Sequence, residues 1–451
     1  MPVSLRQRLS AFLASHPEAA RLTVGYSGGM DSHVLLHLLA AQHAAWPERT
    51  VRAIHVDHGL QSASAAWSEH CARVCRELAV PFSALAISVQ PAPGESPEAA
   101  ARRARYAALA AEIGPDAALL TAHHRDDQAE TLLLQLLRGA GPHGLAAMPA
   151  RARLGAGWLL RPLLEIDRSE LLAYAQDQGL RWVEDASNAD TGYDRNYLRH
   201  RVLPALRQRW PAATRTLARS ARWCAETAAW LDQAAETDLV SVAAGAGVLC
   251  LPALRDLDEA RQRNVLRHWL RRQGLPVPDS QQLDHILRDG LSAARDRQPC
   301  VRWPGGEIRR YRDRLYAMSP RARHDPGAVL HWRPEGGGYP PLSLPGVGHL
   351  RLERASGAGL RAALVDPAGL TVRFRQGGER FHPIGRRHGQ ELKKLLQDAA
   401  VPPWERDCLP LLYRGSALVA VIGMGIAAEA AASAGETGWL PILDPPPTTL
   451  R

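Results

Sequence analysis

The sequence predicts an α/β fold in which helices cover a parallel sheet, followed by a helical region and a small α+β region. Four short apolar or β-branched runs, at residues 22–27, 51–57, 82–87 and 117–122, alternate with segments of helical periodicity, as in proteins with parallel sheets. The first run ends in a glycine-rich turn that passes directly into an apolar helix. Ligands of open parallel sheets bind beyond the carboxyl ends of the strands, so the polar residues after each run are the candidate site.

The loop after the first run, residues 27–32, reads Ser-Gly-Gly-Met-Asp-Ser. Its glycines allow a tight turn, and the N–H groups at the start of the next helix remain free to bind an anion. An aspartate tolerates a phosphate only when a divalent cation lies between them. The chain has no lysine before Lys393, which excludes a Walker A loop. The loop resembles the SGGxDS loop of N-type ATP pyrophosphatases, and the alternative is a glycine turn without a ligand. The predicted ATP ligands are Ser27, Gly28, Gly29, Met30, Asp31 and Ser32.

Polar residues also follow the second and fourth runs. Asp57 and His58 come at the end of the second run. Either residue alone would more often cap a helix or pack in the core than have a functional role. After the fourth, Asp127 and Glu130 are three residues apart and share one helix face, with His123 at its N-terminal edge. Two carboxylates facing a phosphate would repel it unless they bind magnesium or take a proton from an amine. The alternative is an acidic first turn that favours the helix dipole.

Two arginines on a predicted helix at residues 98–106 are candidate anion ligands. Arg102 and Arg105 share one face of this helix, and Arg103 points elsewhere. An arginine pair can clamp a phosphate or a base edge with better geometry than lysine can. Simple surface charge is the alternative.

The charge of the chain predicts a polyanionic partner. Its 451 residues carry a formal net charge of +9. The segment 199–222 contains Trp210 and no carboxylate, whereas a solvated helix face normally mixes both signs. We therefore expect a nucleic-acid contact here. The arginines of this segment are Arg199, Arg201, Arg207, Arg209, Arg215, Arg219 and Arg222.

Other features limit the class of protein. The 6 cysteines include no Cys-x-x-Cys pair, which favours reduced thiols and argues against cysteine-dependent sulfur transfer. No uncharged apolar run approaches the roughly 20 residues that span a bilayer, and the first ten residues show no secretory h-region. We expect a cytoplasmic protein without a membrane partner.

The composition divides the chain into four parts. We predict a nucleotide-binding domain at residues 1–210, a mainly helical domain at 211–325, a Pro/Gly-rich linker or loop region at 326–365, and a compact α+β domain at 366–442.

In the last domain, β-like runs at residues 371–374 and 417–422 flank a helix at 390–399. Lys393 and Lys394 are the only lysines of the chain, in a segment rich in arginine. A composition so biased to arginine favours a required ammonium group at these positions, the alternative being a solvated helix.

The motifs of the first 210 residues together resemble those of the tRNA(Ile)-lysidine synthase family, although each motif alone is weak. They are HVDHGL from His55, E-A-x-x-R-x-x-R-Y from Glu98, AHHxDDQAET from Ala122, L-x-R-G-x-G-x-x-G-L-x-x-M from Leu136, R-P-L-L from Arg161 and D-x-S-N-x-x-x-x-x-x-R-N-x-x-R from Asp185. The lysine-containing segment is similar to the C-terminal domain of long members of this family, which binds the tRNA acceptor arm.

The resemblance implies a PP-loop ATPase fold of the adenine nucleotide alpha-hydrolase type and an ATP-dependent ligase. The reaction would join free lysine to carbon 2 of the wobble cytidine in the CAU anticodon of tRNA(Ile), through an adenylated cytidine, and so change the reading and charging of the tRNA from Met to Ile. The partners would be this tRNA and free lysine, with a monomer and a homodimer both open. Two rival readings are a thiolating or amidating PP-loop enzyme and a non-catalytic RNA-binding protein.

The resemblance also suggests roles for the candidate residues. Asp31 and Asp127 would bind magnesium, and Glu130 or Asp127 would orient and deprotonate the amine of lysine. The predicted catalytic residues are Asp31, Asp127, Glu130, His123 and Arg105, of which the last two, with Arg102, would contact the base or the adenylate. The predicted tRNA ligands are Arg102, Arg199, Arg201, Arg207, Arg386, Arg387, Lys393 and Lys394.

Overall fold

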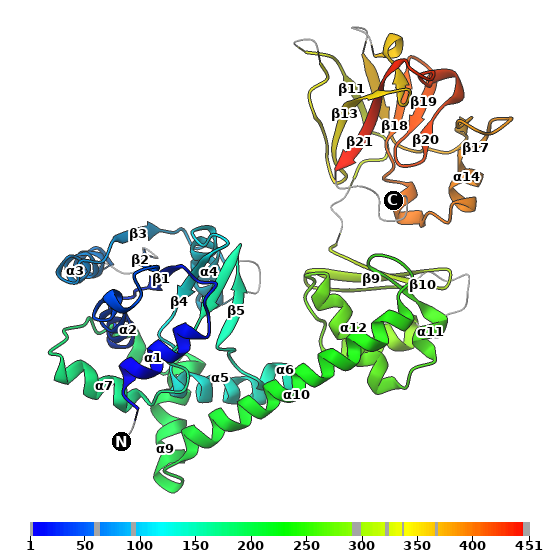
Figure 1. Ribbon diagram of the computed structural model, residues 1–451. Coiled ribbons are helices and arrows are strands. Elements are labelled where there is room, and N and C mark those ends of the chain that lie inside the picture. The colour runs from blue at the N-terminus through cyan, green and yellow to red at the C-terminus, as the bar shows by residue number, and fades with distance from the viewer. Residues whose placement is uncertain are drawn as a thin grey trace. The chain divides into compact units, whose positions relative to one another are not determined.

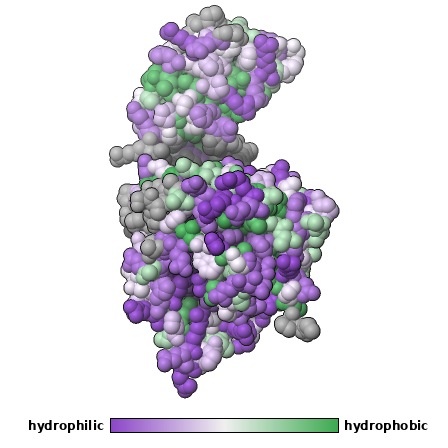
Figure 2. Space-filling view, turned by 90° about the vertical axis from the view of Figure 1, so that its left-hand side faces the viewer, coloured by the Kyte–Doolittle hydropathy of each residue, from purple (hydrophilic) through white to green (hydrophobic). Residues whose placement is uncertain are grey.

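The chain forms two compact units, Met1–Ala234 and Ala235–Arg451. The computed structural model in Figure 1 describes residues 3–57, 64–91, 96–290, 299–320, 324–335, 338–365 and 369–444. His58 and the rest of its motif to residue 60 lie outside these ranges. Within them, no helix has both the length and the apolar character needed to cross a bilayer. On the face seen in Figure 2, hydrophilic residues predominate and apolar ones form smaller areas between them.

A six-stranded sheet organises the first unit, in the order β3-β2-β1-β4-β6-β5. Neighbouring strands run parallel except β5, which pairs antiparallel with β6 at the edge. The sheet confirms the predicted fold class. The strands are β1 (Arg21–Gly25), β2 (Thr50–Asp57), β3 (Phe82–Ala86), β4 (Ala117–Leu120), β5 (Arg151–Leu154) and β6 (Gly157–Leu160). The first four match the predicted runs, and β5 and β6 are additional.

Helices pack on both faces of this sheet because successive side chains of each strand point to opposite faces. On β4, Ala118 and Leu120 join a core with α1, α2, α3 and α7, whereas Leu119 joins a second core with Leu109 of α4. The helices are α1 (Leu5–Ala14), α2 (Met30–Ala40), α3 (Ser64–Glu77), α4 (Pro97–Ala111), α5 (Arg125–Leu137), α6 (Pro142–Leu145) and α7 (Arg168–Asp177).

A nearly continuous helical segment follows the sheet. It consists of α8 (Asp194–Tyr197), the π-helical turn η3 (Leu198–Val202) and α9 (Leu203–Arg209), and it precedes the long helix α10 (Ala213–Val242). Both α8 and η3 contact α5, so this arginine-rich segment lies against the helix that carries Asp127 and Glu130.

The second unit begins with helices on a small antiparallel sheet, in the order β7-β10-β9-β8. We predicted a mainly helical region at 211–325, and the helices of this region agree with that prediction; the sheet is an additional element that we did not predict. Strand β9 buries Glu307 and Arg310, which lie on opposite faces of the strand, at 1% and 3% exposure. Charged residues therefore interrupt the apolar alternation that reveals a strand. The elements are β7 (Val248–Cys250), α11 (Leu251–Arg255), α12 (Glu259–Arg272), α13 (Ser280–His285), β8 (Cys300–Trp303), β9 (Gly306–Tyr311) and β10 (Arg314–Met318).

The passage predicted as a linker or loop region also contains strands. Strand β11 (Val329–Trp332) pairs with β15 (Leu370–Arg373). Strand β13 (Gly348–Ser356) pairs with the whole length of β21 (Thr437–Asp444). Most of the described proline and glycine residues of this passage lie in the connections between strands, and Gly348 begins β13. Trp332 illustrates the result: it belongs to the core of the last domain, and its Nε1–H donates to the Pro340 carbonyl at 2.7 Å.

The remaining strands complete two larger sheets, β11-β15-β18-β19-β20 and β12-β13-β21-β14, and a two-stranded sheet of β16 and β17. The predicted runs at 371–374 and 417–422 correspond to β15 and β19, and the predicted helix at 390–399 corresponds to α14, which buries Leu392, Leu395 and Leu396. The further bounds are β12 (Leu342–Leu344), β14 (Leu360–Arg361), β16 (Arg380–Phe381), β17 (Gln390–Glu391), α14 (Leu392–Asp398), α15 (Pro403–Arg406), β18 (Leu411–Arg414), β19 (Ala417–Val421) and β20 (Gly425–Ile426).

Candidate active site

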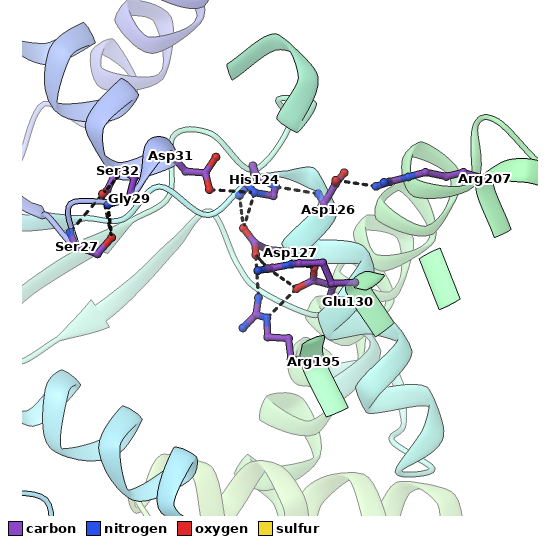
Figure 3. Close-up of polar contacts among 11 residues, drawn as sticks. Ser27, Gly29, Asp31, Ser32, His124, Asp126, Asp127, Glu130, Arg195 and Arg207 are labelled. Atoms are coloured by element: carbon purple, nitrogen blue, oxygen red, sulfur yellow. Dashed lines mark hydrogen bonds and ion pairs between the residues drawn. The ribbon is translucent and has the colours of Figure 1, made fainter. Parts of the chain in front are cut away.

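The loop between β1 and α2 is held in shape by its own side chains (Figure 3). The hydroxyls of Ser27 and Ser32 lie 3.0 Å apart, and the Ser32 hydroxyl donates to the Gly29 carbonyl at 2.9 Å. Gly28 has a φ of +83°, and a Cβ at this position would lie 3.1 Å from Cys71 Sγ. The loop therefore needs glycine here, and it directs the first N–H groups of α2 toward the carboxyl end of β1.

His124 joins this loop to α5. It is the N-cap of α5, where its Nδ1 accepts from the Asp126 N–H at 3.2 Å. Its Nε2 lies 3.6 Å from Asp31 Oδ2 and 3.5 Å from Asp127 Oδ2. Burial alone would lower the pKa of His124, but the Asp127 and Asp31 carboxylates raise it. One imidazole thus faces carboxylates from two different strand ends.

Asp127 and Glu130 share two arginines that lie four residues apart on α8 and η3. Arg195 donates to Glu130 Oε2 at 2.8 Å and to Asp127 Oδ1 at 3.1 Å. Arg199 donates to Glu130 Oε1 at 2.7 Å, to its Oε2 at 2.9 Å and to Asp127 Oδ1 at 3.1 Å. We call these four side chains the carboxylate–arginine cluster. Two negative and two positive charges balance within it, and Glu130 is completely buried.

The electrostatics of Asp127 follow from these contacts. Burial would raise its pKa, but His124, Arg195 and the His124 backbone N–H, which donates to Oδ2 at 2.9 Å, lower it to about 2. Asp127 is therefore ionised at any physiological pH. A carboxylate with so low a pKa holds cations well and accepts protons poorly.

The predicted residue His123 lies in a different environment from its neighbour. Its Nδ1 lies 2.8 Å from the Thr121 hydroxyl, and burial lowers its pKa to about 3, so the ring is neutral. On α4, the guanidinium carbons of Arg102 and Arg105 lie 5.2 Å and 5.6 Å from the centre of the Tyr106 ring. Burial lowers the pKa of Arg105.

The predicted tRNA ligands differ in their surroundings. Arg199 belongs to the carboxylate–arginine cluster, and Arg207 pairs with Asp126 at 2.7 Å. Arg201 is exposed, and it has no ion-pair partner among the residues that the structure describes. The second unit carries the other candidates at exposed positions on α14 and on the preceding loop: Arg386, Arg387, Lys393 and Lys394.

Two residues of the site were missed from the sequence as candidates, His124 and Arg195. Both residues lie within the motifs. Which of His123 and His124 faces the carboxylates depends on the direction of the chain after β4, and the sequence does not show this direction. The sequence signal for His124 is its place three residues before Asp127, which is the spacing of a capping box. Arg195 has its partners 65 and 68 residues away, and no local pattern reveals such a pair.

The donor set suits magnesium only in part. The described residues contain no group of three or more His, Cys, Asp and Glu side chains that could hold a metal ion. Mg²⁺, however, often takes one or two carboxylates together with phosphate oxygens. Asp31 fits, because its Oδ1 is buried without a hydrogen-bond partner among the described residues. Asp127 is a ligand only if its Oδ1 exchanges an arginine for the metal.

Three parts of the chain match models of known protein families. Residues 1–206 match the model of the PP-loop domain, residues 249–316 that of the TilS substrate binding domain, and residues 370–442 that of the TilS substrate C-terminal domain. Among solved structures, the U34-tRNA thiolase NcsA from Methanococcus maripaludis with its [4Fe-4S] cluster has a TM-score of 0.42 and 16% identity, covering 49% of this chain and 78% of its own.

Curated relatives match over nearly the whole length. The tRNA(Ile)-lysidine synthase of Coxiella burnetii is 43% identical, covering 98% of this chain and 97% of its own. That of Alkalilimnicola ehrlichii is 47% identical, covering 93% of each chain, and that of Methylococcus capsulatus is 44% identical, covering 93% and 95%. With its PP-loop, its substrate-binding domains and this full-length similarity, the chain belongs to the tRNA(Ile)-lysidine synthase family.

Proposed function

We propose that the crevice between the loop at residues 27–32 and the carboxylate–arginine cluster is where this chain joins lysine to carbon 2 of the wobble cytidine of CAU-anticodon tRNA(Ile). The observation that carries the proposal is the position of His124, whose Nε2 lies within 3.6 Å of Asp31 and of Asp127. It links the ATP loop to the helix that bears the second carboxylate. Family membership makes the chain an ATP-dependent PP-loop ligase rather than a thiolating enzyme or a non-catalytic RNA-binding protein.

The loop and the N-terminus of α2 would hold the phosphates of ATP. The free N–H groups of α2 suit an anion, and Ser27 and Ser32 supply hydroxyls beside them. Asp31 would hold Mg²⁺ with Asp127, and the metal would neutralise phosphate charge. Met30, buried at the first position of α2, fixes the start of the helix.

The reaction would proceed in two balanced steps. The cytosine O2 attacks the α-phosphorus of ATP, and pyrophosphate leaves with the electrons of the broken bond. The lysine amine then attacks carbon 2, AMP leaves, and the amine loses a proton. Arg102 and Arg105, which lie against Tyr106, and neutral His123 would contact the base or its adenylate.

The two carboxylates would have different roles toward the lysine amine, one orienting it and the other accepting its proton. Asp127, with a pKa of about 2, suits holding an ammonium or a metal better than accepting a proton. Glu130 is buried and bonded through both oxygens, so it reaches an amine only after Arg195 or Arg199 moves. We therefore assign orientation of the amine to Asp127 and keep Glu130 as the candidate base.

The tRNA would reach this crevice with its wobble base unstacked, as single-stranded loops are usually read. Exposed Arg201 is the candidate phosphate contact near the site. The exposed Lys393, Lys394, Arg386 and Arg387 would contact the rest of the tRNA. Such remote contacts are needed because the elongator methionine tRNA has the same anticodon.

Incorporation of labelled lysine into RNA tests the function. The purified protein is incubated with ATP, Mg²⁺, labelled lysine and either the CAU-anticodon tRNA(Ile) transcript or the elongator tRNA(Met) transcript. We expect label in the first transcript only, and none with Asp31→Ala. Asp177→Ala, at an exposed position at the end of α7, is the control. Equal labelling of both transcripts, or full activity of Asp31→Ala, would contradict the proposal.

A further inference from the structure

Arg161 lies at the same sheet edge as the candidate active site. It directly follows β6, which runs parallel to β4, and the carboxyl end of β4 leads to His123 and His124. Its backbone N–H donates to the Ala150 carbonyl at 2.9 Å. The side chain is only 7% exposed. The carboxyl end of a third strand therefore delivers a buried charge to the edge where ligands bind.

The buried guanidinium of Arg161 is poorly compensated. Nη1 donates to the Pro149 carbonyl at 2.7 Å. Nε is buried and has no hydrogen-bond partner in the described part of the chain. No carboxylate of the described residues forms an ion pair with it. A buried charge is costly unless it is paired, so an unpaired one at a ligand-binding edge indicates that a ligand supplies the negative charge.

The groups near Arg161 add positive charge. Burial lowers the pKa of Arg161, the neighbouring Tyr106 side chain raises it, and Arg102 lowers it. Arg161 in turn helps burial to lower the pKa of His123. Arg102 and Arg105 lie against the Tyr106 ring. On the other side of His123, the negative charges of Asp127 and Glu130 are already matched by the arginines of the cluster. The guanidiniums around Tyr106 thus have no carboxylate of their own among the described residues.

Another buried arginine of the first unit, Arg49, has several structural partners, although its Nη1 is also buried without a hydrogen-bond partner among the described residues. Arg49 donates to the carbonyls of Leu13 and His16 at 2.9 Å and 3.3 Å, and it pairs with Glu48 at 3.7 Å. It therefore closes the end of α1, at the opposite end of β2 from the candidate site. Arg161 differs in position and in lacking a carboxylate, which makes Arg49 a matched control.

We propose that Arg161, with Arg102 and Arg105, forms a subsite for a phosphoryl group. Guanidinium groups bind phosphoryl oxygens through two parallel hydrogen bonds, and the free Nε of Arg161 can donate one of them. The phosphoryl group has two sources in the proposed function, on which this inference rests: the α-phosphate that passes from ATP to the cytidine, and a backbone phosphate of the tRNA beside the wobble nucleotide.

Binding measurements on the full chain distinguish these sources. Thermal unfolding of Arg161→Met is followed without ligand and with saturating Mg-ATP, since a ligand that binds only the folded state raises Tm. Affinity for the tRNA(Ile) transcript is measured by filter binding from low to high salt. Loss of most of the ATP-induced shift with unchanged tRNA binding identifies the nucleotide phosphate. An unchanged ATP shift, with a salt slope smaller by about 1, identifies the tRNA phosphate.

Controls separate a binding role from a structural one. Arg49→Met should lower Tm but keep the ATP shift and the tRNA affinity of the wild type. If Arg161→Met behaves in the same way, the subsite does not exist. Arg161→Lys, which keeps the charge but loses the fork, and Arg102→Gln, at an exposed position, should each weaken the same ligand if Arg161→Met does not fold. A wild type that shows an Arg161-dependent shift but never labels tRNA would refute the proposed function and leave the subsite standing.

Discussion

His124 Nε2 lies almost midway between two carboxylate oxygens, 3.6 Å from Asp31 and 3.5 Å from Asp127. Asp31 is the second residue of the helix after β1 and Asp127 belongs to the helix after β4, so this imidazole links the first turns of two helices (Figure 3). Without it, the two carboxylates would repel each other across the crevice. From this relationship we propose that His124 is a positioning residue for the loop at residues 27–32.

Asn in place of His124 separates its two roles. Asn is a strong N-cap and can still accept the Asp126 N–H, so we expect stability within about 1 kcal/mol of the wild type. It removes the group that faces both carboxylates, and lysine incorporation should fall by roughly 100-fold. Activity and urea unfolding are measured together. Wild-type activity of His124→Asn would show that capping is the whole role of this residue.

Acid should destabilise the first unit through His123. Its pKa is about 3 in the folded protein and 6.5 when unperturbed, so the unfolded state binds more protons between these values and stability falls as the pH drops from 6.5 toward 3. Asp127, lowered from 3.8 to about 2, adds a loss below pH 4. Tm is recorded against pH. His123→Gln should give a shallower slope between pH 6.5 and 4, and an identical slope would contradict the assignment.

Loss of the Glu130 charge should be costly. Glu130→Gln leaves Arg195 and Arg199 with only Asp127 as a counter-charge in a buried cluster, and breaking a buried ion pair from one side costs about 3–5 kcal/mol. Urea unfolding gives the free energy. The double variant Glu130→Gln with Arg199→Met should recover part of the loss, because it restores the charge balance. Additive losses in the double variant would mean that the two side chains do not interact.

The pattern of apolar residues predicted the strands whose side chains are buried in an apolar core. Strand β1 has its central residues Leu22, Thr23 and Val24 buried on both faces of the sheet, and such runs are visible in the sequence. Strand β5 was missed because Arg151 and Arg153 alternate at the edge and place their guanidiniums 3.6 Å and 3.7 Å from the Trp158 ring centre. Because the arginines of β5 stack on the Trp158 indole, the sequence of β5 lacks the apolar residues that would predict a strand.

The motifs of the candidate site are visible in the sequence, and the contacts between their side chains are not. Asp31, Asp127 and Glu130 were chosen because carboxylates beside a phosphate loop need a cation. Arg195 and Arg199 supply part of that positive charge because α8 and η3 pack on α5. This packing is a tertiary contact, and the local sequence does not reveal it. The same contact turns Arg199, expected on the tRNA surface, toward Glu130.

Arg201 and Arg199 are two residues apart and should respond differently to alanine. Exposed Arg201 should contribute to tRNA binding only, so Arg201→Ala should reduce the salt slope of binding by about 1 and leave Tm unchanged. Arg199→Ala opens the carboxylate–arginine cluster and should lower Tm and activity. Filter binding over a salt series and thermal unfolding measure both. A loss of stability in Arg201→Ala would place this side chain in the folded core and not on the RNA.

Alanine at Gly28 should strain the ATP loop in two separable ways. A left-handed conformation costs a non-glycine residue about 1–2 kcal/mol, and the new Cβ would also lie 3.1 Å from Cys71 Sγ. Gly139 has a φ of +69°, and a Cβ added there would meet no atom of the described residues within 4 Å, so Gly139→Ala measures the backbone cost alone. Gly28→Ala should lose more stability than this control, and adding Cys71→Ala should reduce the difference. Equal losses for the two glycines would show that the loop moves away from Cys71 at no cost in stability. In that case a change in the shape of the loop would be detected by measuring Mg-ATP binding.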